Sequence, residues 1–114
     1  MDDDSWTTAA RLADWLDEAS GRPREVQLLL QVLKITEEAG EAAEALQGVL
    51  GANPRKGRSH TEEDVAGELC DVIVSAMVAL TTVAPDAAAV FRRHLARVSV
   101  RSLEQREASA AHEV

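Results

Sequence analysis

The sequence predicts an all-α chain, and three observations support this fold class. Alanine and leucine are abundant, tyrosine is absent, and no Asn-Gly or Asp-Gly pair marks a two-residue β-hairpin. Glycine and proline residues mark the boundaries between four long segments. At 114 residues the chain is expected to form one domain, residues 1–114, which has a core of its own but gains stability from partner subunits.

The first two helices have recognisable ends. Ser5 is predicted to be the N-cap of a first helix that ends near Ser20 and Gly21. Pro23 fits the first turn of a second helix, because proline needs no backbone hydrogen bond there. This second helix is predicted to run to about Gly51.

The stretch "GANPRKGRSH", residues 51–60, is the clearest loop, because glycine, asparagine and proline all interrupt helices. Thr61 and Asp64 then resemble a capping box in which aspartate replaces glutamate. They predict the start of a third helix that ends near Ala84.

Pro85 precedes the fourth predicted helix, which runs from Asp86 to about Arg106. Both chain ends, residues 1–4 and 107–114, are expected to be flexible.

Composition and charge exclude several classes of partner. The net charge of −8 argues against a nucleic-acid polymer or an anionic membrane as the main partner. With 46% hydrophobic residues, the chain is nevertheless a folded protein rather than an acidic disordered tail. A single cysteine, Cys70, suits a reducing compartment, and the start "MDDDSW" lacks the features of a signal peptide. The expected location is therefore the cytoplasm.

The third predicted helix is apolar on nearly all sides between Val65 and Ala84. Its length would suit a membrane span, but Glu68 and Asp71 lie inside it and its flanks are charged, which favours a buried bundle helix. A four-helix chain of this size cannot cover every side of such a helix. We therefore expect an oligomeric helical bundle, a homodimer or homotetramer, with this helix at the subunit interface.

Two pairs of acidic residues are predicted to form a metal site. Glu38 and Glu41 lie three residues apart, as do Glu68 and Asp71, so each pair shares one helix face. If the second and third helices pack antiparallel, the two faces meet in an all-oxygen site suited to Mg²⁺, with Mn²⁺ as the alternative. The Glu-x-x-His pattern of di-iron bundles is absent from both helices. The simpler alternative is that residues 37–44 form a solvated acidic face.

Basic side chains supply candidate phosphate ligands. Lys56 and Arg58 lie in the predicted loop, and Arg93 and Arg97 lie four residues apart on the fourth predicted helix. We expect these four residues to bind substrate, although basic residues at such places equally often face solvent.

The two acidic motifs carry a resemblance to a known family. "EEAGEAAEALQ", followed by "ELCDVIVSAMVAL", resembles the MazG-like all-α nucleoside triphosphate pyrophosphohydrolases, whose signature is EExxE, a spacer, then ExxD. Here the spacer between Glu41 and Glu68 is 26 residues. The resemblance implies that Glu38, Glu41, Glu68 and Asp71 bind Mg²⁺. It gives Glu37 and Glu38 catalytic roles, with Glu37 holding a second ion or orienting the attacking water.

The resemblance implies hydrolysis of a nucleoside triphosphate to the monophosphate and pyrophosphate, with a role in clearing the nucleotide pool. Two alternatives stay open, namely a catalytically silent helical oligomer that binds a nucleotide or protein, and a phosphoribosyl-ATP pyrophosphatase-like enzyme. The family often carries lysine and, four residues later, asparagine on its last helix. This chain has Arg93 and Arg97, or His94 and Val98, at that spacing, so selectivity and turnover are not fixed by the motif.

Three further side chains are assigned by spacing. Trp15, with Leu12 and Leu16, is expected to pack in the core, whereas Trp6 caps the bundle or, as the alternative, stacks on a base. Cys70 lies between the two acids of the ExxD motif and is expected to point into the packing.

Overall fold

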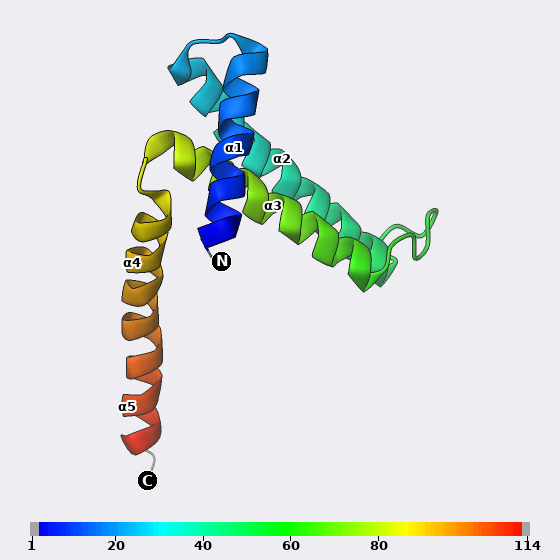
Figure 1. Ribbon diagram of the computed structural model, residues 1–114. Coiled ribbons are helices and arrows are strands. Elements are labelled where there is room, and N and C mark those ends of the chain that lie inside the picture. The colour runs from blue at the N-terminus through cyan, green and yellow to red at the C-terminus, as the bar shows by residue number, and fades with distance from the viewer. Residues whose placement is uncertain (1–2, 113–114) are drawn as a thin grey trace.

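The protein is all-helical over residues 3–112, the part of the chain that the computed structural model describes. Figure 1 shows a long central hairpin of helices, one helix lying across it, and a helical arm that leaves its far end. The elements are α1 (Asp3–Ser20), α2 (Arg24–Leu50), α3 (Glu62–Val83), α4 (Ala87–Ser99), a π-helical turn η1 (Val100–Glu104) and α5 (Gln105–His112). The all-α prediction is confirmed.

Helices α2 and α3 pack side by side and antiparallel, joined by the loop of residues 51–61. At the opposite end of the pair, Arg24 Nη2 donates a hydrogen bond to the carbonyl oxygen of Thr82 at 3.0 Å. Helix α1 packs mainly against α3. This arrangement places the middle of α2 opposite the first half of α3, where the acidic motifs lie.

The loop between α2 and α3 has a defined cap on each side. Gly51 adopts φ +65°, a left-handed conformation that favours glycine, and its N–H donates to the Gln47 carbonyl. On the other side, the Asp64 N–H donates to Thr61 Oγ1 at 3.2 Å and the Thr61 N–H donates to Asp64 Oδ2 at 2.9 Å. The predicted capping box is therefore confirmed, with aspartate serving in place of glutamate.

The helix boundaries differ from the predicted ones at three places. Helix α1 already includes Ser5, which is therefore not its N-cap. Pro23 is the N-cap of α2 rather than a first-turn residue. The last helical segment is interrupted by a π-turn at Val100–Glu104, which the sequence did not signal, and then continues past Arg106 to His112.

A small core joins α1 to the end of α3 and the start of α4. Trp6 and Phe91 pack with ring centroids 5.7 Å apart, and Met77 and Val78 lie beside them. Trp15 is 61% exposed, so its predicted place in the core is wrong for the single chain. The two tryptophans lie nine residues apart and so face opposite sides of α1, and Trp6 occupies the core face.

Cys70 is exposed and lines a groove between α1 and α3, so its predicted packing is likewise wrong for the single chain. Helix α1 crosses α3 nearer to Met77 and Val78, and the side of α3 that carries Cys70 stays open.

Helix α2 has its polar and apolar sides reversed relative to an ordinary surface helix. The residues that it buries are polar or small: Gln27, Gln31, Glu38, Ala42, Ala45 and Gly48. Its exposed side carries an apolar stripe with i, i+3, i+4, i+7 spacing: Val26, Leu29, Leu30 and Leu33, each 39–57% exposed. Such a stripe is typical of a helix face that packs against another molecule.

The chain is also far more extended than a monomeric domain of its length. Its radius of gyration is 18.4 Å, against about 13 Å for a compact domain of roughly 100 residues. Helix α3 buries only Met77, Val78 and Ala79. By length and composition α3 could cross a membrane, which is weak evidence because core helices of soluble proteins meet the same test and α3 carries Glu68 and Asp71.

The open apolar faces predict self-association. We expect the 12.3 kDa chain to sediment as a dimer or larger species at micromolar concentration, and its unfolding midpoint to rise with protein concentration. Leu29→Lys should weaken assembly, because it places a charge in the exposed stripe, whereas Glu18→Lys on α1 should not. Met77→Asp should unfold the chain itself, because Met77 belongs to the core. A well-folded wild-type monomer at this concentration would contradict the prediction.

The capping box predicts a pH-dependent contribution to stability. Hydrogen bonds from the Thr61 backbone and then its side chain lower the pKa of Asp64 from its ordinary 3.8. Because the folded-state pKa is depressed, the contribution is present above the unfolded pKa and is lost as the pH falls through the folded value. Asp64→Ala removes the carboxylate that accepts the hydrogen bond from the Thr61 N–H, so it should destabilise the protein near neutral pH and differ less from wild type in acid. Urea unfolding at both pH values measures this, and an equal loss at both would contradict it.

Candidate metal centre

Three glutamates from two helices converge between α2 and α3. Glu38 and Glu41 lie one turn apart on α2, and Glu68 reaches them from α3. One carboxylate oxygen from each lies within 4.8 Å of the other two. Antiparallel packing thus brings together residues that are about thirty positions apart in the chain.

The cluster is short of hydrogen-bond partners. Glu38 is buried, with 7% of its surface exposed, and its Oε2 has no partner among the described residues. Glu68 Oε2 is also buried without a partner there. Removing a carboxylate oxygen from water without a compensating bond is costly. The donor set therefore fits a cation, and its all-oxygen chemistry fits a hard divalent ion.

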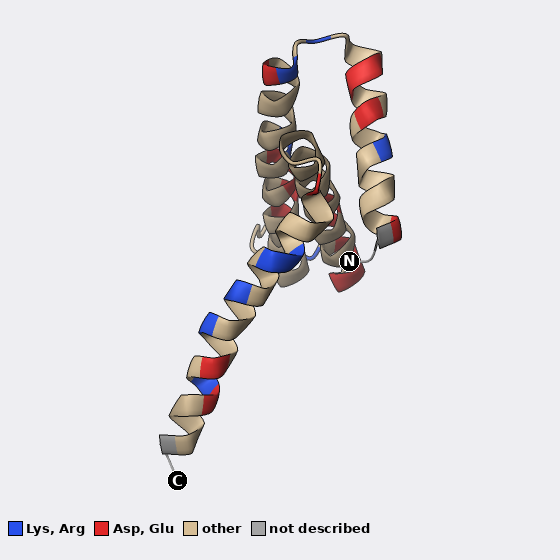
Figure 2. Ribbon diagram, turned by 60° about the vertical axis from the view of Figure 1, so that its left-hand side comes forward, with Lys and Arg blue, Asp and Glu red and all other residues tan. Residues whose placement is uncertain are grey.

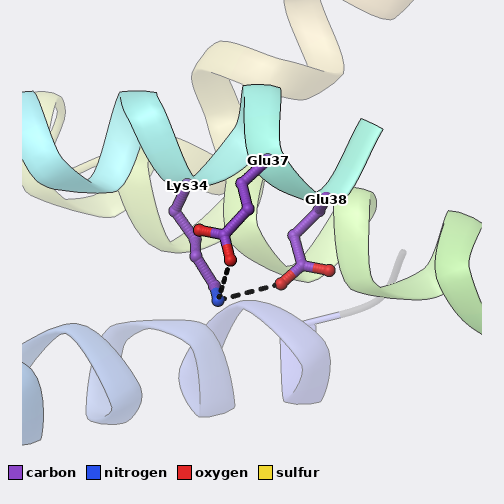
Figure 3. Close-up of polar contacts among 3 residues, drawn as sticks. All are labelled: Lys34, Glu37 and Glu38. Atoms are coloured by element: carbon purple, nitrogen blue, oxygen red, sulfur yellow. Dashed lines mark ion pairs between the residues drawn. The ribbon is translucent and has the colours of Figure 1, made fainter. Parts of the chain in front are cut away.

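Lys34 is the cation that this structure places beside the cluster. Its Nζ lies 3.0 Å from Glu38 Oε1 and 3.7 Å from Glu37 Oε1, as Figure 3 shows. The hydrogen bond to Glu38, and then the charges of Glu37 and Glu38, raise the pKa of Lys34. One ammonium faces several carboxylates, so the local charge stays negative.

The remaining negative charge acts on Glu41. Repulsion from the charge of Glu38 is the main cause that raises the pKa of Glu41, and desolvation and the charges of Glu68 and Glu37 raise it further. A raised carboxylate pKa means that proton uptake relieves the cluster, and a bound divalent cation would relieve it in the same way.

The other two predicted acids lie at the edge of the cluster. Asp71 is exposed and is not one of the three converging residues, but it lines the same open groove as Glu68. Glu37 is also exposed and faces Lys34. The structure thus brings together Glu38, Glu41 and Glu68 from the predicted set and leaves Glu37 and Asp71 within one turn of it.

The open groove runs from the cluster to the loop. It has a volume of about 600 Å³ and is lined by Ser59, His60, Glu63, Asp64, Gly67, Glu68 and Asp71. Ser59 and His60 also border a second hollow of about 240 Å³, which Lys56 lines together with Asn53 and Gln47. Lys56 therefore lies at the loop end of a polar surface that begins at the acidic cluster.

The loop is held against α2 by backbone contacts. The Ser59 N–H donates to the Gly48 carbonyl at 3.0 Å. Any side chain at Gly48 would overlap His60 and Ser59, so glycine permits this close approach. Asn53 Oδ1 accepts from the Arg55 N–H at 3.0 Å, and Gly57 adopts φ +62° in the following turn. These contacts fix the backbone that carries Lys56 and Arg58.

Arg93 and Arg97 lie away from the cluster. They belong to α4, part of the arm that begins beyond the end of α3 (Figure 2). Val83 lies fifteen positions after Glu68, which is roughly 22 Å along the helix. Within one chain, Arg93 pairs with Asp86 at 3.7 Å and Arg97 contacts His94 at 3.4 Å. Their predicted substrate contacts would therefore need a second copy of the chain.

Sequence reasoning did not single out Gln31 or His60. Gln31 lies seven residues before Glu38, inside the apolar run "LLLQVL", and is buried with neither amide atom paired among the described residues. The sequence signal that could have found Gln31 is a single amide residue within an apolar run, two helical turns before Glu38 and so on the same helix face. His60 ends the predicted loop, and its Nδ1 lies 2.8 Å from Ser59 Oγ at the groove.

Comparisons with known proteins found no matching family model, no matching curated protein and no matching solved structure.

Removing one charge from the cluster should stabilise the metal-free protein. We expect Glu41→Gln to raise the thermal unfolding midpoint in chelator-treated buffer, because it relieves repulsion from Glu38 and Glu68. The same change should weaken Mn²⁺ binding, measured by calorimetry, at least tenfold. Glu44→Gln, one turn further along α2 and outside the three-residue cluster, is the matched control and should alter both quantities little. Equal behaviour of the two variants would exclude the proposed ligand role of Glu41.

Proposed function

We propose that the protein hydrolyses a nucleoside triphosphate to the monophosphate and pyrophosphate, using Mg²⁺ bound by the acidic cluster, with Mn²⁺ as a substitute. The observation that carries this proposal is the convergence of buried Glu38 and partly buried Glu68 with exposed Glu41, in which Oε2 of Glu38 and Oε2 of Glu68 are buried without partners among residues 3–112. A folded chain retains such an arrangement at a cost in stability, and ion binding offsets that cost.

The residues of the cluster have separable roles in this proposal. Glu38, Glu41 and Glu68 hold the ion, and Asp71 completes the set from the groove that it shares with Glu68. The bound ion supplies neutralisation of phosphate oxygens and activation of water. Glu37 is exposed beside the cluster, where its carboxylate accepts a proton from the attacking water.

Lys34 holds Glu37 and Glu38 in place before the substrate arrives. Its ammonium lies within 4 Å of both carboxylates. The Lys34 side chain is 52% exposed, so solvent and substrate have access to it. Lys34 thereby limits repulsion within the cluster while adding a positive charge next to it.

The loop is the proposed binding place of the pyrophosphate end. Lys56 lines the hollow next to the groove, and the backbone around Gly48 and Ser59 fixes the loop. Arg58 contributes from the same segment, packing its Cγ beside Gly51. Positive charge at this end stabilises the leaving pyrophosphate.

The sequence resemblance supports the same activity. EExxE followed by ExxD is the signature of MazG-like pyrophosphohydrolases, and three of its acids converge here. The related phosphoribosyl-ATP pyrophosphatase reaction uses the same type of site. A phosphoribosyl-ATP pyrophosphatase is therefore the alternative enzyme, and the two activities are distinguished by which substrate the protein hydrolyses.

A homodimer or homotetramer in the cytoplasm completes the proposal. The exposed apolar stripe on α2 offers a surface for the second copy. Assembly would also give Arg93 and Arg97 a route to the cluster of a neighbouring copy. These same open surfaces are what a catalytically silent oligomer would use, so activity has to be measured directly.

We expect pyrophosphate release from at least one member of a panel of ribo- and deoxyribonucleoside triphosphates in the presence of Mg²⁺. Glu38→Gln and Asp71→Asn should reduce the rate at least a hundredfold, and Glu18→Gln less than threefold, because Glu18 lies on α1, outside the cluster and the hollow beside Lys56. Helical circular dichroism checks that each variant folds. Hydrolysis confined to phosphoribosyl-ATP would favour the alternative enzyme. Nucleotide binding without pyrophosphate release would favour the silent oligomer.

A further inference from the structure

The acidic groove and the loop hollow meet at two residues. The groove of about 600 Å³ includes Glu68 and Asp71, and the hollow of about 240 Å³ includes Lys56. The two linings share Ser59 and His60. A phosphate chain that reaches from the proposed metal centre to Lys56 therefore has to pass these two side chains.

The ring of His60 has a defined seat on α2. It packs on Gly48, where any side chain would overlap its Nδ1 and Cγ atoms. The same Nδ1 lies 2.8 Å from Ser59 Oγ. Gly48 comes seven residues after Glu41, which is about 10 Å along α2 and close to the same helix face. His60 is thus fixed on the loop side of the acidic cluster, with part of its surface exposed.

The Ser59–His60 pair keeps one hydrogen-bond donor for a ligand. A serine hydroxyl and a neutral imidazole carry two polar hydrogens, and the hydrogen bond between them uses one. The backbone N–H of Ser59 is already engaged, because it donates to the Gly48 carbonyl at 3.0 Å. When the Ser59 hydroxyl donates to Nδ1, the ring proton lies on Nε2, and this N–H is the donor that remains.

The charges around the pair make such a donor useful to a phosphate. Four of the seven residues that line the groove are acids: Glu63, Asp64, Glu68 and Asp71. They repel a phosphate wherever no cation or donor offsets their charge. Lys56 supplies positive charge in the hollow, and the proposed ion supplies it at the cluster. Ser59 and His60 carry no negative charge, so a phosphate meets less repulsion where the two surfaces join.

We propose that Ser59 keeps the proton of His60 on Nε2, and that this N–H donates a hydrogen bond to the phosphate chain where it passes from the metal centre to Lys56. This inference rests on the proposed function and deepens it. In that arrangement His60 contacts the β-phosphate of the substrate, which leaves as part of pyrophosphate. A nucleoside monophosphate, whose one phosphate is held at the ion, does not reach His60.

Binding of the two reaction products tests the contact. Calorimetry with Mg²⁺ measures affinity for pyrophosphate and, as the control ligands, for a panel of the common nucleoside monophosphates. His60→Leu removes the donor, whereas His60→Gln places an amide N–H near the position of Nε2. We expect His60→Leu to weaken pyrophosphate binding about tenfold, as for loss of a hydrogen bond to a charged group, and His60→Gln to weaken it less than about threefold. Both variants should leave monophosphate affinity within about twofold of wild type and keep the helical circular dichroism.

The ring nitrogens of His60 report on the tautomer without any ligand. Long-range ¹H–¹⁵N spectra in mildly alkaline buffer, where imidazole is neutral, distinguish a proton on Nε2 from one on Nδ1. The signals of His60 are assigned by their loss in His60→Gln. We expect the proton on Nε2 in wild type, a larger population with the proton on Nδ1 in Ser59→Ala, and a shift of the wild-type Nε2 signal when pyrophosphate and Mg²⁺ are added. A wild-type ring that carries its proton mainly on Nδ1 would contradict the inference.

The calorimetric outcomes distinguish this inference from the function on which it rests. A wild type that releases pyrophosphate from a triphosphate, with unchanged pyrophosphate affinity in His60→Leu, would overturn the role of His60 alone. An equal loss of affinity in His60→Leu and His60→Gln would assign the ring to packing on Gly48 and also overturn it. A wild type that binds neither pyrophosphate nor any monophosphate with Mg²⁺ would overturn both proposals.

Discussion

The structure depends on carboxylates placed between two packed helices. Glu38, Glu41 and Glu68 repel one another, and this repulsion raises the pKa of Glu41. The α2–α3 pair has to supply enough packing elsewhere to hold them together. It does so with small residues, Ala42, Ala45 and Gly48, which let the helices and loop approach closely. The small residues on the inner face of α2 thus allow both the close packing of α2 against α3 and the convergence of the three glutamates.

Burying the polar side of α2 has a second consequence on its opposite side. Because the inner face carries glutamines and Glu38, the leucine residues of α2 are left outward, including Leu29 and Leu33. In a monomer this distribution gives little hydrophobic stabilisation. The extended shape and the largely exposed α3 likewise indicate that a single chain buries little apolar surface. Site formation and self-association are therefore expected to be linked energetically.

Charge is unevenly distributed along the molecule in a way that suits its proposed substrate. The arm of α4, η1 and α5 is rich in arginine, whereas acidic residues dominate the rest of the chain, as Figure 2 shows. An all-acidic centre would repel a triphosphate without an ion. Lys34 next to it and Lys56 at the loop reduce that repulsion locally. The proposed place of the terminal phosphates, near Lys56, follows from where these positive groups lie.

The sequence by itself determined the features that depend on neighbouring residues. Helical spacing, the Thr61–Asp64 capping box and the glycine at position 51 gave the helical class and the ends of the central pair, because capping and left-handed turns are local interactions. Periodicity placed Glu38 beside Glu41. Only the tertiary structure decided that Glu68 joins them, that Trp6 rather than Trp15 enters the core, and that Gln31 is buried. These three features depend on which faces of two helices pack together, and an apolar or polar stripe on one helix does not specify which helix it packs against. The π-turn at residues 100–104 had no local sequence signal. Whether the outward leucine residues of α2 become buried depends on a neighbouring molecule and not on contacts within the chain.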